Sequence, residues 1–257
     1  MANFSLRGKL IGNIKAVLFD KDGTLTNSEF HLLSLANARV LAVKKRLKES
    51  IDDEQLTIIN NLLEKIYGLT NHGLNPHSAV AIASRHENLL STATAICSVI
   101  ENWPKSIDIA NDVFLMVDEE LSAKDPNYNL RPLLPGVKSF LNKLHQSKVK
   151  CALISNDSKK GIEDFLELNN LHTKFCHYWS CEHSPSKPDP NAVKELCKKL
   201  NLTPGECALI GDSDSDLKMA RKAGIGIAMG YVDGWKIKPS LTYQQELISN
   251  WEDLSCH

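Results

Sequence analysis

The sequence contains no hydrophobic run that approaches the roughly 20 apolar residues needed to cross a bilayer. Its first residues, MANFSLRGKLIGN, also lack the apolar stretch of a secretory signal. A protein without either feature is expected to remain in the cytoplasm and to have no membrane partner.

An excess of either charge is also missing, because 30 Lys and Arg residues stand against 31 Asp and Glu residues, for a formal net charge of -1. Nucleic acids and membrane surfaces select for a strong basic excess, so this balance argues against both and favours a small metabolite. The 257 residues, 42% hydrophobic and 24% charged, have the composition of a globular protein. This length allows one large domain, or a core with a smaller inserted domain.

The cysteines show no paired arrangement. There are seven of them, an odd number with no CxxC, which predicts free thiols in a reducing compartment. One local group, Cys176, His177, Cys181 and His183, contains residue types that bind zinc. Its spacing matches no common zinc-finger pattern and two of its members lie in a strand-like run, so we expect no zinc site there.

Five short apolar runs occur, and all but the last end in polar residues. The clearest is KAVLF at residues 15–19, which Asp20 follows directly. This pattern predicts buried strands whose carboxyl ends carry polar side chains. The other four runs are residues 149–157, 174–180, 206–212 and 224–230.

Helical patterns alternate with these strands, at residues 135–147, 158–170, 191–201 and 215–224. Their apolar residues recur at spacings of three and four, which is typical of a helix with one buried face. Strands that alternate with helices predict a doubly wound α/β core, with a parallel sheet covered on both faces. Ligands bind beyond the carboxyl ends of such strands, so the polar residues there should share one site.

Residues 27–131 interrupt the alternation with long helical patterns and no convincing strand. They predict an all-helical inserted domain of about four helices. The core would then consist of residues 1–26 and 132–257, and a linker with three prolines, at 125–135, would lead back to it.

Within the insertion, the polar break GLTNHGLNP at residues 68–76 makes Asn71 and His72 candidates for substrate contact. A linking turn is the more ordinary explanation of both residues. Arg85 and Lys105 could bind a second anionic group, or could be solvated like most surface charges.

The motif DKDGTL at residues 20–25 is the strongest chemical signal. Asp20 and Asp22 can face one ligand if the chain turns after the strand, and Gly23 permits that turn. Cleavage of a phosphate monoester needs such a pair, one carboxylate to attack phosphorus and one to protonate the leaving oxygen and later deprotonate water. The alternative interpretation is a polar turn without chemistry.

The apolar strand followed by DKDGTL resembles the first motif of the haloacid dehalogenase-like superfamily, DxDGT. The resemblance continues through four ordered motifs over nearly the whole core. It implies that Asp20 is the nucleophile, that Asp22 is the acid and base, and that Thr24 supports them. The second motif is matched by Ser155, which with Asn156 would bind the phosphate.

The third and fourth motifs are matched by Lys187 in SKPDP and by Asp212 in GDSDSD. The resemblance implies that Lys187 offsets the repulsion between Asp20 and an anionic phosphate. It also implies a Mg²⁺ ion bound by Asp20, the backbone carbonyl of Asp22 and Asp212, with Asp216 supporting or binding directly.

The acidic segment of the fourth motif has a second interpretation, in which Ser213 or Asp214 caps the following helix. The two interpretations are compatible, because one residue of the segment can cap while its neighbours bind a metal.

The presence of an acid at Asp22 disfavours dehalogenation, because a halide leaving group needs no proton. A helical insertion directly after the first motif resembles phosphoglycolate phosphatases and beta-phosphoglucomutases. We therefore expect a magnesium-dependent phosphatase that hydrolyses a small phosphorylated metabolite, phosphoglycolate first, through an aspartyl phosphate. The alternatives are a sugar phosphomutase of the same superfamily and a non-catalytic protein that binds phosphate and Mg²⁺.

Overall fold

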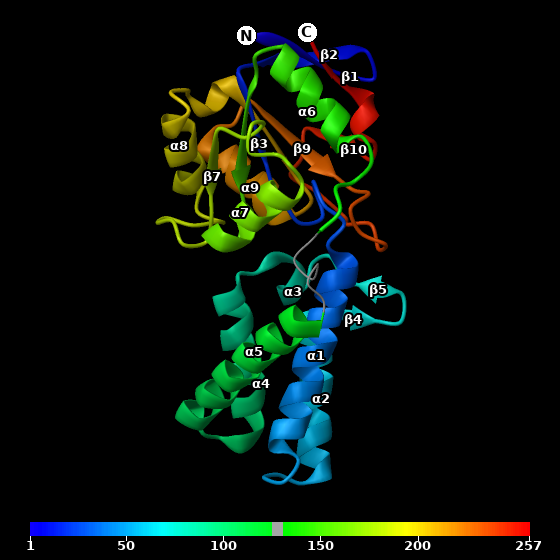
Figure 1. Ribbon diagram of the computed structural model, residues 1–257, viewed down its shortest axis with the longest axis vertical. Helices are drawn as coiled ribbons and strands as arrows, with labels where there is room; N and C mark the ends of the chain where they lie inside the picture. Colours follow the sequence, from blue (N-terminus) through cyan, green and yellow to red (C-terminus); the bar gives the residue numbers. More distant parts are fainter. Residues whose placement is uncertain (125–130) are drawn as a thin grey trace. The chain divides into compact units, whose positions relative to one another are not determined.

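The computed structural model describes residues 1–124 and 131–257 (Figure 1). These residues form two compact units, a core unit of residues 1–28 and 131–257 and a helical unit of residues 29–124. Most of the predicted linker, residues 125–130, lies outside the described residues. No helix of the described chain combines the length and hydropathy needed to span a membrane.

The core unit is built on a six-stranded sheet in which every neighbouring pair is parallel. The predicted parallel sheet is therefore confirmed. All five predicted strands are present, and the sixth follows a polar loop whose sequence shows no apolar run. In spatial order the strands are β10 (Glu246–Ile248), β9 (Ile227–Tyr231), β8 (Cys207–Gly211), β3 (Ala16–Phe19), β6 (Lys150–Ile154) and β7 (His177–Trp179).

Helices cover both faces of this sheet, as expected for a doubly wound fold. Val17 and Phe19 of β3 pack into one hydrophobic cluster with α6 (Val137–Gln146) and α7 (Lys159–Leu168). The alternate residues Ala16 and Leu18 pack on the other face against α8 (Pro190–Lys199) and α9 (Asp214–Ala223). Because the central strands are buried on both faces, they lack the alternation of a half-exposed strand.

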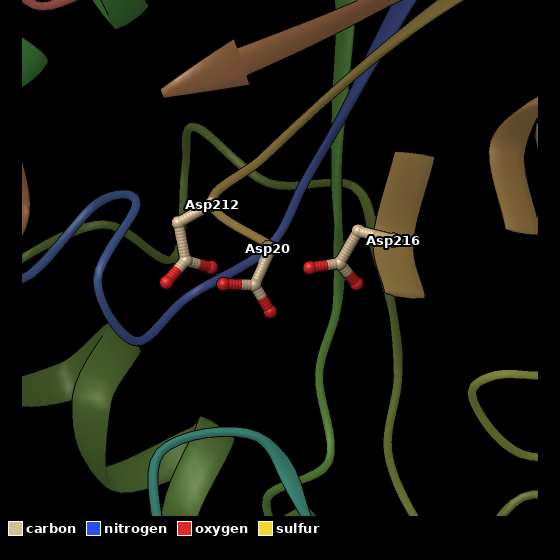
Figure 2. Close-up of side chains that lie close together, drawn as sticks. All are labelled: Asp20, Asp212 and Asp216. Atoms are coloured by element: carbon tan, nitrogen blue, oxygen red, sulfur yellow. The ribbon is translucent and has the colours of Figure 1, made fainter. Parts of the chain in front are cut away.

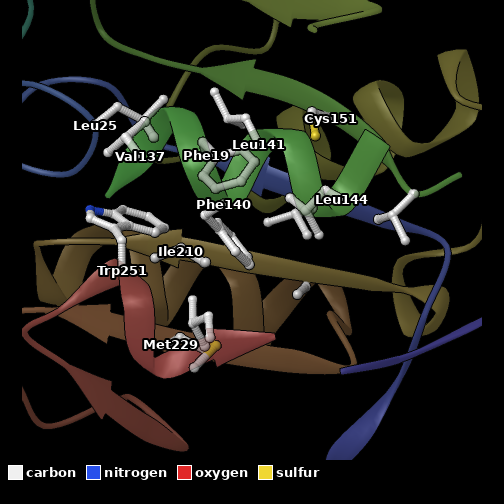
Figure 3. Close-up of a cluster of buried hydrophobic side chains, with 14 of the residues drawn as sticks. Phe19, Leu25, Val137, Phe140, Leu141, Leu144, Cys151, Ile210, Met229 and Trp251 are labelled. Carbon is white, nitrogen blue, oxygen red and sulfur yellow. The ribbon is translucent and has the colours of Figure 1, made fainter. Parts of the chain in front are cut away.

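A second, antiparallel sheet joins the two ends of the chain and was not predicted. It has the order β11 (Leu254–Cys256), β1 (Ala2–Leu6), β2 (Lys9–Ile14). These strands have at most six residues; β1 buries alternate residues, whereas β2 is exposed or half-buried except at its last residue. Trp251, in a 3-10 turn before β11, packs against Phe140 with the ring centroids 5.5 Å apart, which ties this end of the chain to the main core (Figure 3).

The helical unit contains five helices among its described residues, packed around their own apolar side chains. It also contains a two-stranded hairpin, so the prediction of an all-helical insertion is wrong in that detail. The hairpin is too short to show a strand periodicity, and Thr70 closes it by donating its hydroxyl to the carbonyl of Gly73 at 2.6 Å. The elements are α1 (Glu29–Leu47), α2 (Asp53–Tyr67), β4 (Leu69–Thr70), β5 (Gly73–Leu74), α3 (Ala79–Ile82), α4 (Arg85–Ile100) and α5 (Trp103–Lys124).

All seven cysteines are free thiols, as predicted. Of the four residues with zinc-binding side chains, His183 has other partners, because it stacks on Trp179 at 4.6 Å and shares a hydrogen bond with the hydroxyl of Ser180. Within residues 1–124 and 131–257, the potential metal ligands that converge are Asp20, Asp212 and Asp216.

Candidate active site

Three aspartates meet at the carboxyl edge of the main sheet (Figure 2). Asp20 follows β3 and Asp212 follows β8, and these strands are direct neighbours, so their ends bring the two carboxylates together. Asp216 lies in the first turn of α9, which begins just after β8. Each aspartate contributes an oxygen, and these oxygens all lie within 4.8 Å of one another. We call Asp20, Asp212 and Asp216 the acidic cluster.

Lys187 provides a buried ammonium group beside the acidic cluster. Its Nζ lies 2.7 Å from Oδ1 of Asp20 and 2.5 Å from Oδ1 of Asp216, and it also donates to the carbonyl of Ile154 at 3.3 Å. Burial opposes the ammonium form, but Asp20 and Asp216 outweigh it and hold the pKa of Lys187 above its ordinary value. Lys187 therefore stays charged and fixes the position of two of the three carboxylates.

The acidic cluster retains more negative charge than one lysine offsets. Burial raises the pKa of Asp20 to about 6, with Lys187 opposing the rise and Asp216 adding to it. Burial, then the charges of Asp20 and Asp216, raise the pKa of Asp212 well above its ordinary value. Such shifts express the cost of holding like charges together away from water. A cation between these carboxylates would relieve that cost.

The donor set suits Mg²⁺, which prefers oxygen ligands and keeps several waters. Asp20 and Asp212, two of the residues predicted to hold it, face each other in the acidic cluster. Asp216 is more constrained, because Lys187 contacts its Oδ1 and the hydroxyl of Ser213 donates to its Oδ2 at 2.6 Å. These contacts favour the supporting role of Asp216 over direct binding of the metal, and both roles stay predictions.

The side chain of Asp22 lies in different surroundings from Asp20. It accepts a short hydrogen bond from Ser28 Oγ, and Nζ of Lys21 lies 2.6 Å from its Oδ2. Nε of Arg131 is 3.7 Å from its Oδ1. Burial alone would raise the pKa of Asp22, but Lys21, Arg131 and Ser28 together hold it below the ordinary value. Asp22 is therefore ionised in this conformation.

Lys21 is a site residue that the sequence reasoning missed. Its side chain is only 1% exposed, and its Nζ bridges Asp22 and Oδ2 of Asp157, the latter at 3.1 Å. The ring of Phe165 lies 5.7 Å from the same ammonium group. The one available signal was a charged residue between two aspartates, directly after a buried strand. Because a lysine side chain is normally solvated, the sequence favoured an exposed position for Lys21.

Ser155 and Asn156, the predicted phosphate-binding residues, follow β6, which flanks β3 on the side opposite β8. Ser155 is buried, and its Oγ accepts a hydrogen bond from the backbone N–H of Asp157 at 3.1 Å. Both residues therefore lie at the sheet edge that carries Asp20. Their contact with a phosphate stays a prediction.

Asp212 receives hydrogen bonds from two neutral donors. Thr24 Oγ1, expected to support the site, lies 3.4 Å from Oδ1, and Nε1 of Trp235 lies 2.5 Å from Oδ2. The sequence reasoning missed Trp235, although the loop after the last apolar run had to lie at the same sheet edge.

The remaining aspartate of the fourth motif points elsewhere. Asp214 accepts hydrogen bonds from the backbone N–H and the hydroxyl of Thr242, at 2.7 and 2.8 Å. Ser213 is the N-cap of α9 and accepts from the N–H of Asp216. The capping interpretation is thus confirmed for Ser213, and it coexists with the acidic cluster.

The candidates in the helical unit occupy ordinary structural positions. Asn71 and His72 are exposed in the β4–β5 turn, where the N–H of His72 donates to Oγ1 of Thr70 at 3.2 Å. Arg85 pairs with Asp118 at 2.7 Å, and Lys105 is exposed near the start of α5. The suggested substrate contacts of these four residues stay predictions.

The fold and the acidic cluster define a class of hydrolase, and a family model supports the same assignment. The model for haloacid dehalogenase-like hydrolases matches residues 14–224, which include Asp20, Ser155, Lys187 and Asp212. The chain therefore belongs to the haloacid dehalogenase-like hydrolase family.

Among known proteins, this chain is similar to a phosphoglycolate phosphatase of Vibrio parahaemolyticus, with 26% identity over 89% of this chain and 90% of that protein. A phosphoglycolate phosphatase of Vibrio vulnificus is 32% identical over 44% of this chain, and the match spans 51%, about half, of that relative. A solved structure described as a predicted phosphoglycolate phosphatase from Haemophilus somnus has a TM-score of 0.63 at 21% identity. It covers 95% of this chain and 97% of its own, and it shows the shared fold.

Proposed function

We propose that this protein is a magnesium-dependent phosphatase that hydrolyses a small phosphorylated metabolite through an aspartyl phosphate on Asp20. The supporting observation is that Asp20 lies buried between one ammonium group, Lys187, and two further carboxylates. This environment suits a nucleophile that must approach an anionic phosphate. The relatives named as phosphoglycolate phosphatases make phosphoglycolate the first substrate to test.

The two oxygens of Asp20 would have different tasks. Oδ1 accepts a hydrogen bond from Lys187 at 2.7 Å, which leaves Oδ2 to attack phosphorus. As the P–O bond to Oδ2 forms, the bond to the ester oxygen breaks and the alcohol leaves. Lys187 and the hydroxyl of Ser155 would stabilise the charge on the transferred phosphoryl group.

Asp22 would move the proton in both steps. It gives a proton to the leaving oxygen, and it then removes one from the water that hydrolyses the aspartyl phosphate. Lys21 and Ser28 hold it ionised in this conformation, which is the form that the second step requires. An arriving phosphate brings negative charge, which raises the pKa of a nearby carboxyl group and favours the protonated form needed first.

Asp20, Asp212 and the backbone carbonyl of Asp22 would hold Mg²⁺, which supplies positive charge for the transferred phosphoryl group. Residues outside the four core motifs would select the leaving group. Asn71 and His72 are the candidates, and substitutions there should change which substrates are hydrolysed. The expected absence of a nucleic-acid partner and the cytoplasmic location stay predictions.

Replacing Asp20 with Asn tests the proposal. Mg²⁺-dependent release of phosphate from phosphoglycolate and from p-nitrophenyl phosphate should fall by about four orders of magnitude or more in D20N. Asp214→Asn is a matched control, because Asp214 belongs to the fourth motif but bonds to Thr242. D214N should retain activity, and full activity in D20N would contradict the proposal.

The two alternatives have distinct signatures. A phosphomutase would convert a hexose phosphate into an isomer without free phosphate, which a time course of both products detects. A non-catalytic protein would bind Mg²⁺ but release no phosphate from a broad panel of phosphorylated metabolites.

A further inference from the structure

The loop after β9 reaches the site through one side chain that the proposed reaction does not use. Trp235 is only 4% exposed, and its Nε1 donates to Oδ2 of Asp212 at 2.5 Å. A buried indole N–H requires an acceptor, but a backbone carbonyl would satisfy it as well as a carboxylate. Trp179 illustrates this, because its Nε1 donates to the carbonyl of Pro185 at 2.7 Å. The use of the Asp212 carboxylate as the acceptor for Trp235 therefore suggests a function.

The approach of the two loops depends on a pair of glycines. Gly23 has φ +78°, and a Cβ there would lie 2.2 Å from Nε1 of Trp235 and 2.4 Å from Oδ2 of Asp212. At Gly234, a Cβ would lie 1.7 Å from the carbonyl oxygen of Gly23. A side chain at either position would force the loops apart. The first motif and the loop after β9 are thus built to pack at van der Waals contact around the Asp212 carboxylate.

The charges in the acidic cluster make Asp212 distinct from its neighbours. Asp20 and Asp216 each contact the ammonium group of Lys187. The hydrogen bonds described for Asp212 come from Thr24 and Trp235, both neutral. A neutral donor orients a carboxylate without adding a positive charge that would repel a bound cation.

We propose that Trp235 is a positioning residue for the metal, which fixes Asp212 by its Oδ2 and so directs Oδ1 toward a divalent cation. The inference rests on the metal site of the proposed function and adds a residue outside the four motifs. It also implies an optical signal, because the indole ring is hydrogen-bonded to a metal ligand and its emission should change when the cation binds.

The experiment compares the full-length protein with Trp235→Phe, which keeps an aromatic ring and removes the N–H donor. Mg²⁺ and Mn²⁺ are titrated by calorimetry, without substrate, and tryptophan emission is recorded in parallel. In W235F the affinity for either ion should fall about 10- to 100-fold, the usual cost of losing a hydrogen bond to a metal ligand. The emission change of the wild type should be absent.

Trp179→Phe is the matched control, because Trp179 is also buried and also donates through its indole. W179F should bind Mg²⁺ with wild-type affinity and keep the metal-dependent emission change. If W235F does not fold, W179F provides the second test, because binding of Mg²⁺ seen by calorimetry should change its tryptophan emission if Trp235 is hydrogen-bonded to a metal ligand.

Wild-type affinity in W235F, an emission response to Mg²⁺ that persists in W235F, or unchanged emission of W179F while Mg²⁺ is bound would overturn the assignment of Trp235. Failure of the proposed function is a separate outcome, seen as wild-type protein that does not bind Mg²⁺ or as D20N that still hydrolyses phosphate esters.

Discussion

Asp20 and Asp22 are separated by one residue, yet they lie in regions of opposite electrostatic character. Asp20 belongs to the acidic cluster, where the ammonium group of Lys187 contacts two of the three buried carboxylates. Asp22 belongs to a second group, the Lys21 cluster, formed by Lys21, Asp22 and Asp157. Arg131 lies close to Asp22 as well, so positive and negative charges are balanced there. The pKa of Asp20 is raised to about 6, whereas that of Asp22 is lowered.

This difference shows how one short motif can provide two carboxylates with different tasks. Uncompensated negative charge is concentrated around Asp20, where the proposed reaction requires a cation. The Lys21 cluster needs no cation and keeps Asp22 ionised. Removing the ammonium group of Lys187 should therefore affect activity and stability strongly, whereas removing that of Lys21 should affect mainly stability, and only slightly.

Lys187→Met should have the largest effect. It removes the only ammonium contact described for the acidic cluster and should lower kcat/KM for p-nitrophenyl phosphate by about 10³-fold, the upper range for one charge-stabilising group. Losing one partner of a buried ion pair also costs about 3 to 5 kcal/mol of unfolding free energy, measurable in urea. Lys194→Met, on the exposed face of α8, is the control and should change neither property. An activity loss under tenfold in K187M would contradict the view that Lys187 offsets the negative charge of the acidic cluster.

The pH dependence of the metal-free protein should show an intermediate effect. Because the folded pKa of Asp20 is raised from 3.8 to about 6, its contribution to stability is fully present below pH 3.8 and is lost as the pH rises through about 6. One pKa unit corresponds to about 1.4 kcal/mol, so the loss is at most about 3 kcal/mol. The lowered pKa of Asp22 acts with the opposite sign, and its contribution is lost as the pH falls below 3.8.

Melting temperatures measured in EDTA between pH 4 and pH 7 test this dependence. Asn resembles a permanently protonated Asp, so D20N should become more stable relative to the wild type as the pH rises from about 4 to about 6, and the difference should then level off. A constant difference between the two proteins across this range would show that Asp20 is not electrostatically strained.

Lys21→Met should have the smallest effect on stability, about 1 to 2 kcal/mol in urea denaturation. Asp22 would keep Ser28, and Asp157 would keep the N–H of Ser158, so neither carboxylate loses all of its partners. Mg²⁺ affinity should stay within about twofold of the wild type, because Lys21 makes no contact described with the acidic cluster. Lys160→Met, an exposed lysine of α7, is the control. A loss of metal affinity comparable to that of W235F would erase the distinction between the two clusters.

Much of the fold could be predicted because its central strands are short apolar runs between helices with clear periodicity. The strands that were missed, β1, β2, β10 and β11, have between three and six residues each, which is too short for an alternating pattern to stand out in the sequence. The β4–β5 hairpin is stabilised by hydrogen bonds over two residues per strand, a length at which no periodicity exists.

The sequence by itself indicated that Asp20 and Asp212 would lie at one edge of the sheet, because the carboxyl ends of parallel strands share an edge. The structure added that their strands, β3 and β8, are direct neighbours. The sequence also placed Lys187 and Asp216 in the motifs that deliver them to that edge. Only the tertiary structure decided that Lys21 is buried against Asp157 and that Trp235 donates to Asp212. Those contacts depend on how loops distant in the chain pack together, here through Gly23 and Gly234, and local sequence patterns do not encode such partners.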